Sequence, residues 1–132
     1  MSTVIKLIDE PIVIATIRLP LHDDPQQIEL VNVQVDAVAG EVGAPLYCIL
    51  NLGGAADIDF SDIYLWLGEQ LHNRPGSLTD PRVCTLMLGR DPMVAVWARK
   101  AYQRTGLTIP VFTTLADAVA CARTRQYLAA TS

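Results

Sequence analysis

The residues that could do chemistry gather in one stretch, Leu46–Ser61, in which an apolar run ends at Gly53-Gly54 and acidic residues follow. Two glycines after a buried strand let backbone N–H groups approach a phosphate, as glycine-rich turns do in nucleotide-binding folds. The stretch has no GxGxxG pattern and no P-loop lysine, and Asp57, Asp59 and Asp62 make it acidic. Phosphate or nucleotide binding at Gly53 and Gly54 is therefore an alternative hypothesis only.

The same aspartates carry oxygen atoms of the kind that Mg²⁺ and Ca²⁺ prefer as ligands. Their spacing fits no EF-hand loop, and His22 and His72 have no carboxylate or histidine at ligand spacing. A catalytic pair of carboxylates would need one member in an apolar cleft, an environment that a sequence does not display. We therefore predict no metal site, no cofactor and no enzymatic activity.

Composition and charge favour one cytosolic domain. The chain has 132 residues and 51% apolar content, which suits a single domain over 1–132 with a sizeable core. The net charge of −4, with scattered basic residues, offers no broad positive face for nucleic acid. No run of about 20 apolar residues could cross a bilayer, and the first ten residues lack the regions of a secretory signal. We therefore expect a cytoplasmic protein that does not bind nucleic acid.

The three cysteines, Cys48, Cys84 and Cys121, lie far apart and none belongs to a CxxC pair. Zinc and redox signatures are therefore absent from the sequence. Apolar neighbours flank each cysteine, so we interpret all three as small buried hydrophobic residues.

Apolar strands come first and segments of helical period follow. Val4–Ile8 and the run from Ile12 are typical of an antiparallel hairpin, and Leu46–Leu52 resembles a strand covered on both faces. A helix from about Asp62 to Leu71 and a strand from Val83 come next. The following helix is capped by Asp91, has Pro92 at its first position and ends before Gly106. A strand Ile109–Phe112 and a helix after Thr113 or Thr114 complete the order. Residues 21–43, between the hairpin and the third strand, also have helical spacing.

The spacing of apolar residues predicts which helix faces are buried. The expected buried residues are Ile28, Val31, Val35, Val38 and Val42 in the first helix, Ile63, Trp66, Leu67 and Leu71 in the second, Val94, Trp97 and Ala101 in the third, and Leu115, Ala118, Val119 and Ala122 in the last. Together the elements predict an α/β domain with a mixed sheet of about five strands, an N-terminal antiparallel hairpin followed by βαβ units, and about four helices.

Three segments carry a resemblance to a known family: CILNLGGAADIDFSDIYLWL, VCTLMLGRDPMVAVWARKAYQRTGL and PVFTTLADAVACA. With the element order, they resemble the STAS family, which is named for sulfate transporters and anti-sigma factor antagonists, and in particular its SpoIIAA-like bacterial members. The resemblance spans residues 10–123. It implies a regulatory module that binds a partner protein.

In the anti-sigma antagonists of this family, a partner kinase phosphorylates the serine of an Asp-Ser pair at a helix start. Asp59 stands at the position of the family's aspartate, but Phe60 occupies the position of the serine, and Ser61 lies one residue later. One residue rotates a side chain by about 100° around a helix start, which aims the Ser61 hydroxyl elsewhere. The resemblance thus implies an anti-sigma-type kinase as the partner and Ser61 as the phosphorylation candidate.

We expect the chain to bind a partner protein, or a second copy of itself, through the turn and the helix start. The residues expected in this surface are Gly53, Gly54, Asp59, Phe60, Ser61 and Tyr64. An alternative is a site for a small apolar ligand or lipid, with Phe60, Tyr64, Trp66 and Trp97 in its lining. A homodimer that pairs the edge of the N-terminal hairpin is a further hypothesis.

Overall fold

The computed structural model describes residues 2–43 and 45–131. Its elements follow the predicted order, with a short 3₁₀ helix added before the first α-helix. They are β1 (Thr3–Lys6), β2 (Ile12–Thr16), η1 (Leu21–Asp23), α1 (Gln27–Val42), β3 (Leu46–Asn51), α2 (Phe60–Gln70), β4 (Val83–Leu88), α3 (Met93–Thr105), β5 (Val111–Phe112) and α4 (Leu115–Thr131).

The five strands form one sheet in the order β1-β2-β3-β4-β5. β1 pairs antiparallel with β2, whereas each later pair is parallel. The predicted α/β class and the mixed sheet that starts with an antiparallel hairpin are therefore confirmed.

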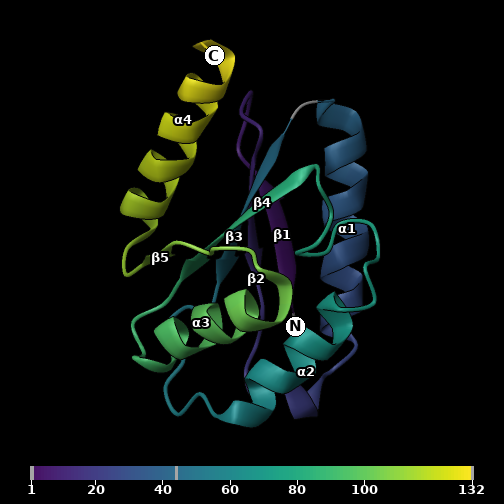
Figure 1. Ribbon diagram of the computed structural model, residues 1–132, viewed down its shortest axis with the longest axis vertical. Helices are drawn as coiled ribbons and strands as arrows, with labels where there is room; N and C mark the ends of the chain where they lie inside the picture. The colour runs from purple at the N-terminus through teal and green to yellow at the C-terminus, as the bar shows by residue number, and fades with distance from the viewer. Residues whose placement is uncertain (1, 44, 132) are drawn as a thin grey trace.

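The sequential strand order decides which helices share a face of the sheet. When each crossover moves one strand further in the same direction and with the same hand, its helix lies on the same side as the previous one. One core cluster accordingly joins residues of α1, α2 and α3 to one face, while Ala118 and Ala122 of α4 belong to the cluster on the other face. Figure 1 shows α4 and α1 on opposite sides of the strands.

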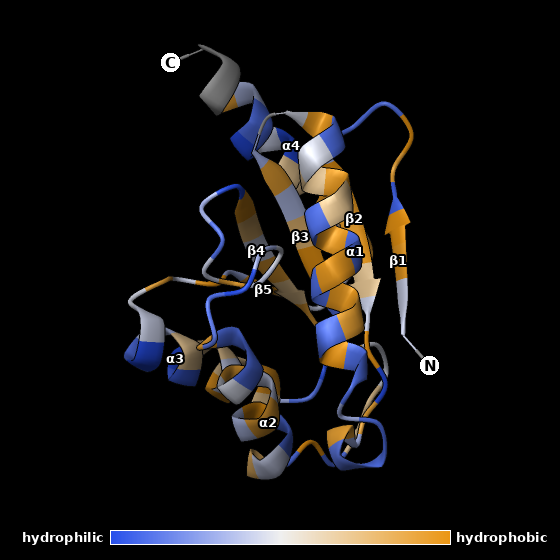
Figure 2. Cartoon of the chain, turned by 90° about the vertical axis from the view of Figure 1, so that its right-hand side faces the viewer, coloured by the Kyte–Doolittle hydropathy of each residue, from blue (hydrophilic) through white to orange (hydrophobic). Residues whose placement is uncertain are grey.

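Side chains of the central strands alternate between these two clusters, as the pleat of a strand requires. Cys48 and Leu50 of β3 face the cluster of the three helices, whereas Tyr47 and Ile49 face the α4 side. The first five residues of β3 are buried, which confirms the prediction of a strand covered on both faces. Figure 2 shows β2, β3 and β4 as largely hydrophobic.

The last strand is shorter than the predicted Ile109–Phe112 and contains only Val111 and Phe112. Pro110 has no N–H to donate to a ladder, although its carbonyl accepts a hydrogen bond from Met87 N–H at 2.9 Å. Ile109 turns into the core, with 5% of its surface exposed. β5 consequently pairs with only the last two residues of β4.

Three helix boundaries and two buried residues differ from the sequence prediction. α1 begins only at Gln27, α2 begins two residues early, at Phe60, and α3 begins at Met93 with Pro92 as its N-cap residue. Leu71 and Leu115 were expected in the core, but they are 39% and 43% exposed. Leu71 follows the last residue of α2 and Leu115 is the first of α4, and ends of helices project past the sheet that covers their middles.

No helix within the described residues combines the length and the apolar character needed to cross a membrane.

Candidate functional site

The turn between β3 and α2 lies at the edge of the sheet where the parallel strands end. Figure 1 shows this edge at the lower end of the molecule, with the start of α2 beside it. Gly53 adopts a positive φ of 60°, which glycine reaches without a steric penalty, and its N–H donates to Asn51 Oδ1 at 2.8 Å. Gly53 and Gly54 are both exposed. The turn is therefore accessible at the edge where open α/β sheets usually bind ligands and partners.

Asp59 fixes the start of α2. Its Oδ1 accepts hydrogen bonds from the N–H groups of Ser61 at 2.8 Å and Asp62 at 3.3 Å, and Asp62 Oδ2 accepts one from Asp59 N–H at 3.2 Å. This reciprocal capping box satisfies N–H groups that a helix start otherwise leaves without partners. Asp59 therefore caps α2, whereas the Ser61 hydroxyl is a donor to Asp59 Oδ1.

Asp62 anchors the same helix start to the rest of the molecule. Its carboxylate is 1% exposed, and Oδ1 accepts a hydrogen bond from Leu21 N–H at 2.8 Å. The loop that follows β2 is thereby attached to α2. Asp62 was considered as a metal ligand, but its two oxygen atoms accept hydrogen bonds from backbone N–H groups.

A further aspartate holds the turn from the side of β4. Asp91 Oδ1 accepts a hydrogen bond from Met93 N–H at 2.8 Å, and Oδ2 accepts one from Ile58 N–H at 3.5 Å. Asp91 was predicted to cap its own helix, and this bond is present. The link to Ile58 was not predicted, because it spans 33 positions and depends on β3 and β4 being neighbours.

The electrostatics of the site follow from these caps. The hydrogen bond from the Ser61 hydroxyl is the largest influence that lowers the pKa of Asp59, and the Asp62 N–H adds to it. Within the described residues, no group of three or more histidine, cysteine, aspartate or glutamate side chains is arranged to hold a metal ion. The carboxylates of Asp59, Asp62 and Asp91 occupy helix-start N–H groups that a phosphate would need.

Two exposed aromatic rings stand on this capped helix start. Phe60 and Tyr64 are one helical turn apart, are 50% and 53% exposed, and stack with ring centroids 6.3 Å apart and planes at 27°. The structure thus places three of the six predicted residues on α2 and Asp59 at its N-cap, with the two glycines at the beginning of the same turn. We call Gly53, Gly54, Asp59, Phe60, Ser61 and Tyr64 the rim surface.

No family model, curated protein or solved structure matches this chain.

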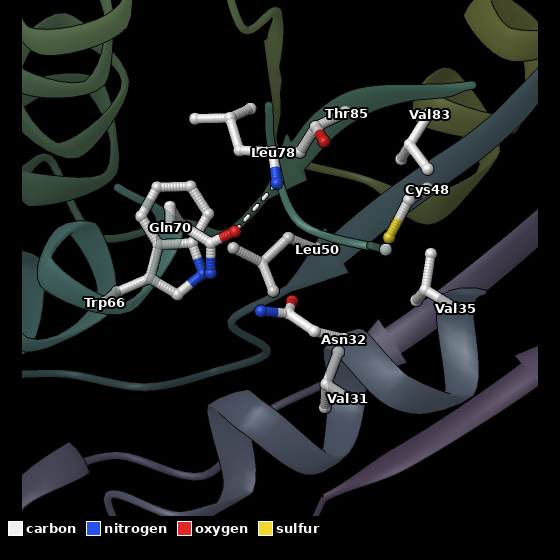
Figure 3. A pocket seen from close by; sticks show the side chains of 11 residues that line it. Val31, Asn32, Val35, Cys48, Leu50, Trp66, Gln70, Leu78, Val83 and Thr85 are labelled. Atoms are coloured by element: carbon white, nitrogen blue, oxygen red, sulfur yellow. Dashed lines mark hydrogen bonds between the residues drawn. The ribbon is translucent and has the colours of Figure 1, made fainter. Parts of the chain in front are cut away.

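The two tryptophans are buried, unlike the two aromatic residues of the rim surface. Trp66 and Trp97 are 4% and 0% exposed and pack edge to face, with centroids 5.7 Å apart, which confirms the interpretation of Trp97 as core. Trp66 lines an interior cavity of about 20 Å³, also lined by Asn32, Cys48 and Gln70 (Figure 3). That volume suits about one water molecule.

The cysteines and histidines lie away from the rim surface. Cys48 is buried, and burial raises the pKa of its thiol to about 12, so it stays protonated as the prediction of a small hydrophobic residue requires. Cys84 and Cys121 are partly exposed, so they fit that prediction less well. His22 and His72 are exposed.

A cleft at the opposite end of β4 was not predicted. It has a volume of about 380 Å³ and lies among residues 78–85, Leu107, Thr108 and Arg125 of α4. Its one sequence signal is Pro110, because the last strand starts only after this residue and so leaves part of β4 without a neighbour.

Proposed function

We propose that this chain is a non-enzymatic, STAS-like regulatory module that binds a partner protein through the rim surface. The main support for this proposal is the stacked, half-exposed pair of Phe60 and Tyr64, which lies on a helix start fixed by hydrogen bonds. Aromatic residues are enriched among the few side chains that dominate binding energy at protein interfaces. A rigid support lowers the conformational entropy that binding would cost.

The charges around the pair indicate the chemistry of the partner. Asp57 and Asp59 are exposed beside Phe60, and hydrogen bonds lower the pKa of Asp59, so its carboxylate is ionised at neutral pH. An apolar pair bordered by negative charge is complementary to a hydrophobic pocket bordered by lysine or arginine. The proposed partner carries such a pocket.

The aspartates favour binding over catalysis at this edge. Asp59, Asp62 and Asp91 each accept hydrogen bonds from backbone N–H groups, and these bonds hold the turn and two helix starts together. A carboxylate used in this way has little freedom to exchange protons with a substrate.

A regulatory role through Ser61 is part of the proposal. Its side chain is exposed, and its hydroxyl donates to Asp59 Oδ1. Phosphorylation by an anti-sigma-type kinase would remove this donor and place two negative charges beside the Asp59 carboxylate. The added charge would favour release of a partner that recognises the ionised cap.

The test is chemical cross-linking and affinity capture from cell extract with the full chain. Phe60→Asp and Tyr64→Ala are each expected to reduce recovery of the main partner at least fivefold. Tyr102→Ala is the matched control, because Tyr102 is also 53% exposed but lies on α3. Unchanged recovery with both rim variants, at unchanged thermal stability, would show that this surface is not the contact.

A further inference from the structure

The first half of β4 has a free edge. β5 pairs only with Met87 and Leu88, through bonds that include Met87 N–H to Pro110 carbonyl at 2.9 Å. In a parallel strand, alternate residues direct both N–H and C=O to the same side. Thr85, two residues before Met87, therefore directs both groups toward the side of β5, where the described part of the chain provides no strand to pair with them.

This free edge forms one wall of the cleft of about 380 Å³. The loop of residues 78–81 forms a second wall, and Leu107 and Thr108 form a third where the chain approaches β5. The volume lies within the range of about 300–1,000 Å³ that is usual for ligand pockets. An extended segment placed here would pair with the part of β4 that β5 does not reach.

The cleft contains a cation that has no carboxylate partner. Arg125 of α4 lines the cleft, and its guanidinium makes no ion pair or hydrogen bond with any described residue. The acidic residue in the lining, Asp80, is already engaged, because its carboxylate binds Arg82 at 2.7 Å and Gly76 N–H at 2.7 Å. The local balance therefore favours a ligand that carries one negative charge.

Tyr47 of β3 lies on the same side of the sheet as α4. Tyr47 is 4% exposed and is the register partner of Cys84 on β4. Burial raises the pKa of Tyr47, Cys84 adds to that rise, and the positive charge of Arg125 opposes it.

We propose that the cleft binds an extended, acidic peptide segment of a partner protein by strand addition. The peptide backbone pairs with Thr85 N–H and C=O, and an aspartate or glutamate side chain binds Arg125. Strand side chains alternate, and Cys84 faces the α4 side whereas Val83 faces the other core cluster. In the bound peptide, the acidic residue faces α4 and Arg125. The residues before and after it face the other side of the sheet, toward Val83 and Leu78, and are expected to be apolar.

The test begins with selection of random displayed peptides on the immobilised full chain. We expect enrichment of an acidic residue between two apolar residues. The enriched peptide should shift the Thr85 amide resonance in an NMR titration of the full chain. Arg125→Gln should weaken its affinity at least tenfold, and Arg104→Gln, which removes an exposed cation from α3, should leave it unchanged.

A backbone-methylated version of the same peptide, blocked at the N–H that pairs with Thr85, should bind at least tenfold more weakly. Failure to enrich acidic peptides would overturn the proposal, as would binding that leaves the Thr85 amide unmoved. An equal response to acetate alone, again without a Thr85 shift, would reduce the site to a simple anion contact. Phe60→Asp should bind the peptide normally, so this outcome is separate from that of the rim surface.

Discussion

Asp62 Oδ1 accepts a hydrogen bond from the backbone N–H of Leu21, which lies 41 positions earlier in the chain. Both residues are buried, with 1% and 0% of their surfaces exposed. The bond joins the loop after β2 to the start of α2, and it is therefore part of the frame that holds the rim surface.

Asp62→Ala is expected to lower the free energy of unfolding by about 2–3 kcal/mol, because Leu21 N–H would be left buried without an acceptor. Asp62→Asn keeps an acceptor oxygen and should cost less. Urea denaturation measures both. Asp117→Ala, in the exposed first turn of α4, serves as the control and should change stability by less than about 0.5 kcal/mol. Equal losses at positions 62 and 117 would contradict the anchoring role.

The pH dependence of stability should report the Asp80–Arg82 pair. Hydrogen bonds from Arg82 and from Gly76 N–H lower the pKa of Asp80 to about 2. A lowered pKa adds stability that is complete above the ordinary aspartate value and is lost as the pH falls through the folded value. We expect wild type to exceed Asp80→Asn by roughly 1–2 kcal/mol at pH 6, and the gap to shrink between pH 4 and pH 2.

Denaturation midpoints measured from pH 2 to pH 7 test this expectation. The control is Asp36→Asn, because Asp36 pairs with the same arginine but its side chain is 42% exposed. Its effect should be small, since exposed ion pairs contribute about 0–1 kcal/mol. A gap for Asp80→Asn that stays constant across this range would show that the pair does not titrate as described.

Local signals account for most of the fold. The apolar run of β3 and the cap at Asp59 act within a few residues, so periodicity and capping chemistry predict them. The wrong expectation that Leu71 and Leu115 are buried has a different origin. Helical spacing predicts the face of a residue, but it does not predict whether the sheet extends far enough to cover the helix end.

Contacts that depend on strand order were not predictable from the sequence. Asp91 reaches Ile58, and Arg125 reaches the cleft beside β4, only because β3, β4 and α4 lie as they do. The residue pattern of one strand does not show which strand lies beside it in the sheet. The rim surface, which is contiguous in sequence, could therefore be proposed before the structure, whereas the cleft beside β4 could not.

Substitution by alanine should change the stability of the protein in opposite directions at two glycines. Gly76 has a φ of +82°, and a Cβ atom there would lie 1.9 Å from the carbonyl oxygen of Asn32. Gly76→Ala is therefore expected to cost about 3 kcal/mol or more, since backbone must move and a left-handed conformation is strained. Gly40, within α1, has no atom within 4 Å of such a Cβ. Gly40→Ala should add about 0.5–1 kcal/mol, and thermal unfolding measures both.

The interior cavity contains two amide side chains with opposite expected effects. Gln70 Oε1 accepts a hydrogen bond from Leu78 N–H at 2.7 Å, whereas Asn32 Nδ2 is buried and has no partner in the described structure (Figure 3). Gln70→Leu would leave a buried backbone donor unpaired and should cost about 1–3 kcal/mol. Asn32→Leu removes an unpaired donor and extends apolar surface into the cavity.

We expect Asn32→Leu to leave stability unchanged or to raise it by up to about 1 kcal/mol, measured by urea denaturation beside Gln70→Leu. Both residues line the same cavity, and Asn32→Leu adds about one methylene more volume than Gln70→Leu, so a smaller loss for Asn32→Leu would report the hydrogen bond of Gln70 and not relief of crowding. Asn32→Ala controls for the loss of packing, and it should be less stable than Asn32→Leu because it leaves the cavity larger. If Asn32→Leu were as destabilising as Gln70→Leu, the Asn32 amide would have to be making a stabilising hydrogen bond inside the cavity.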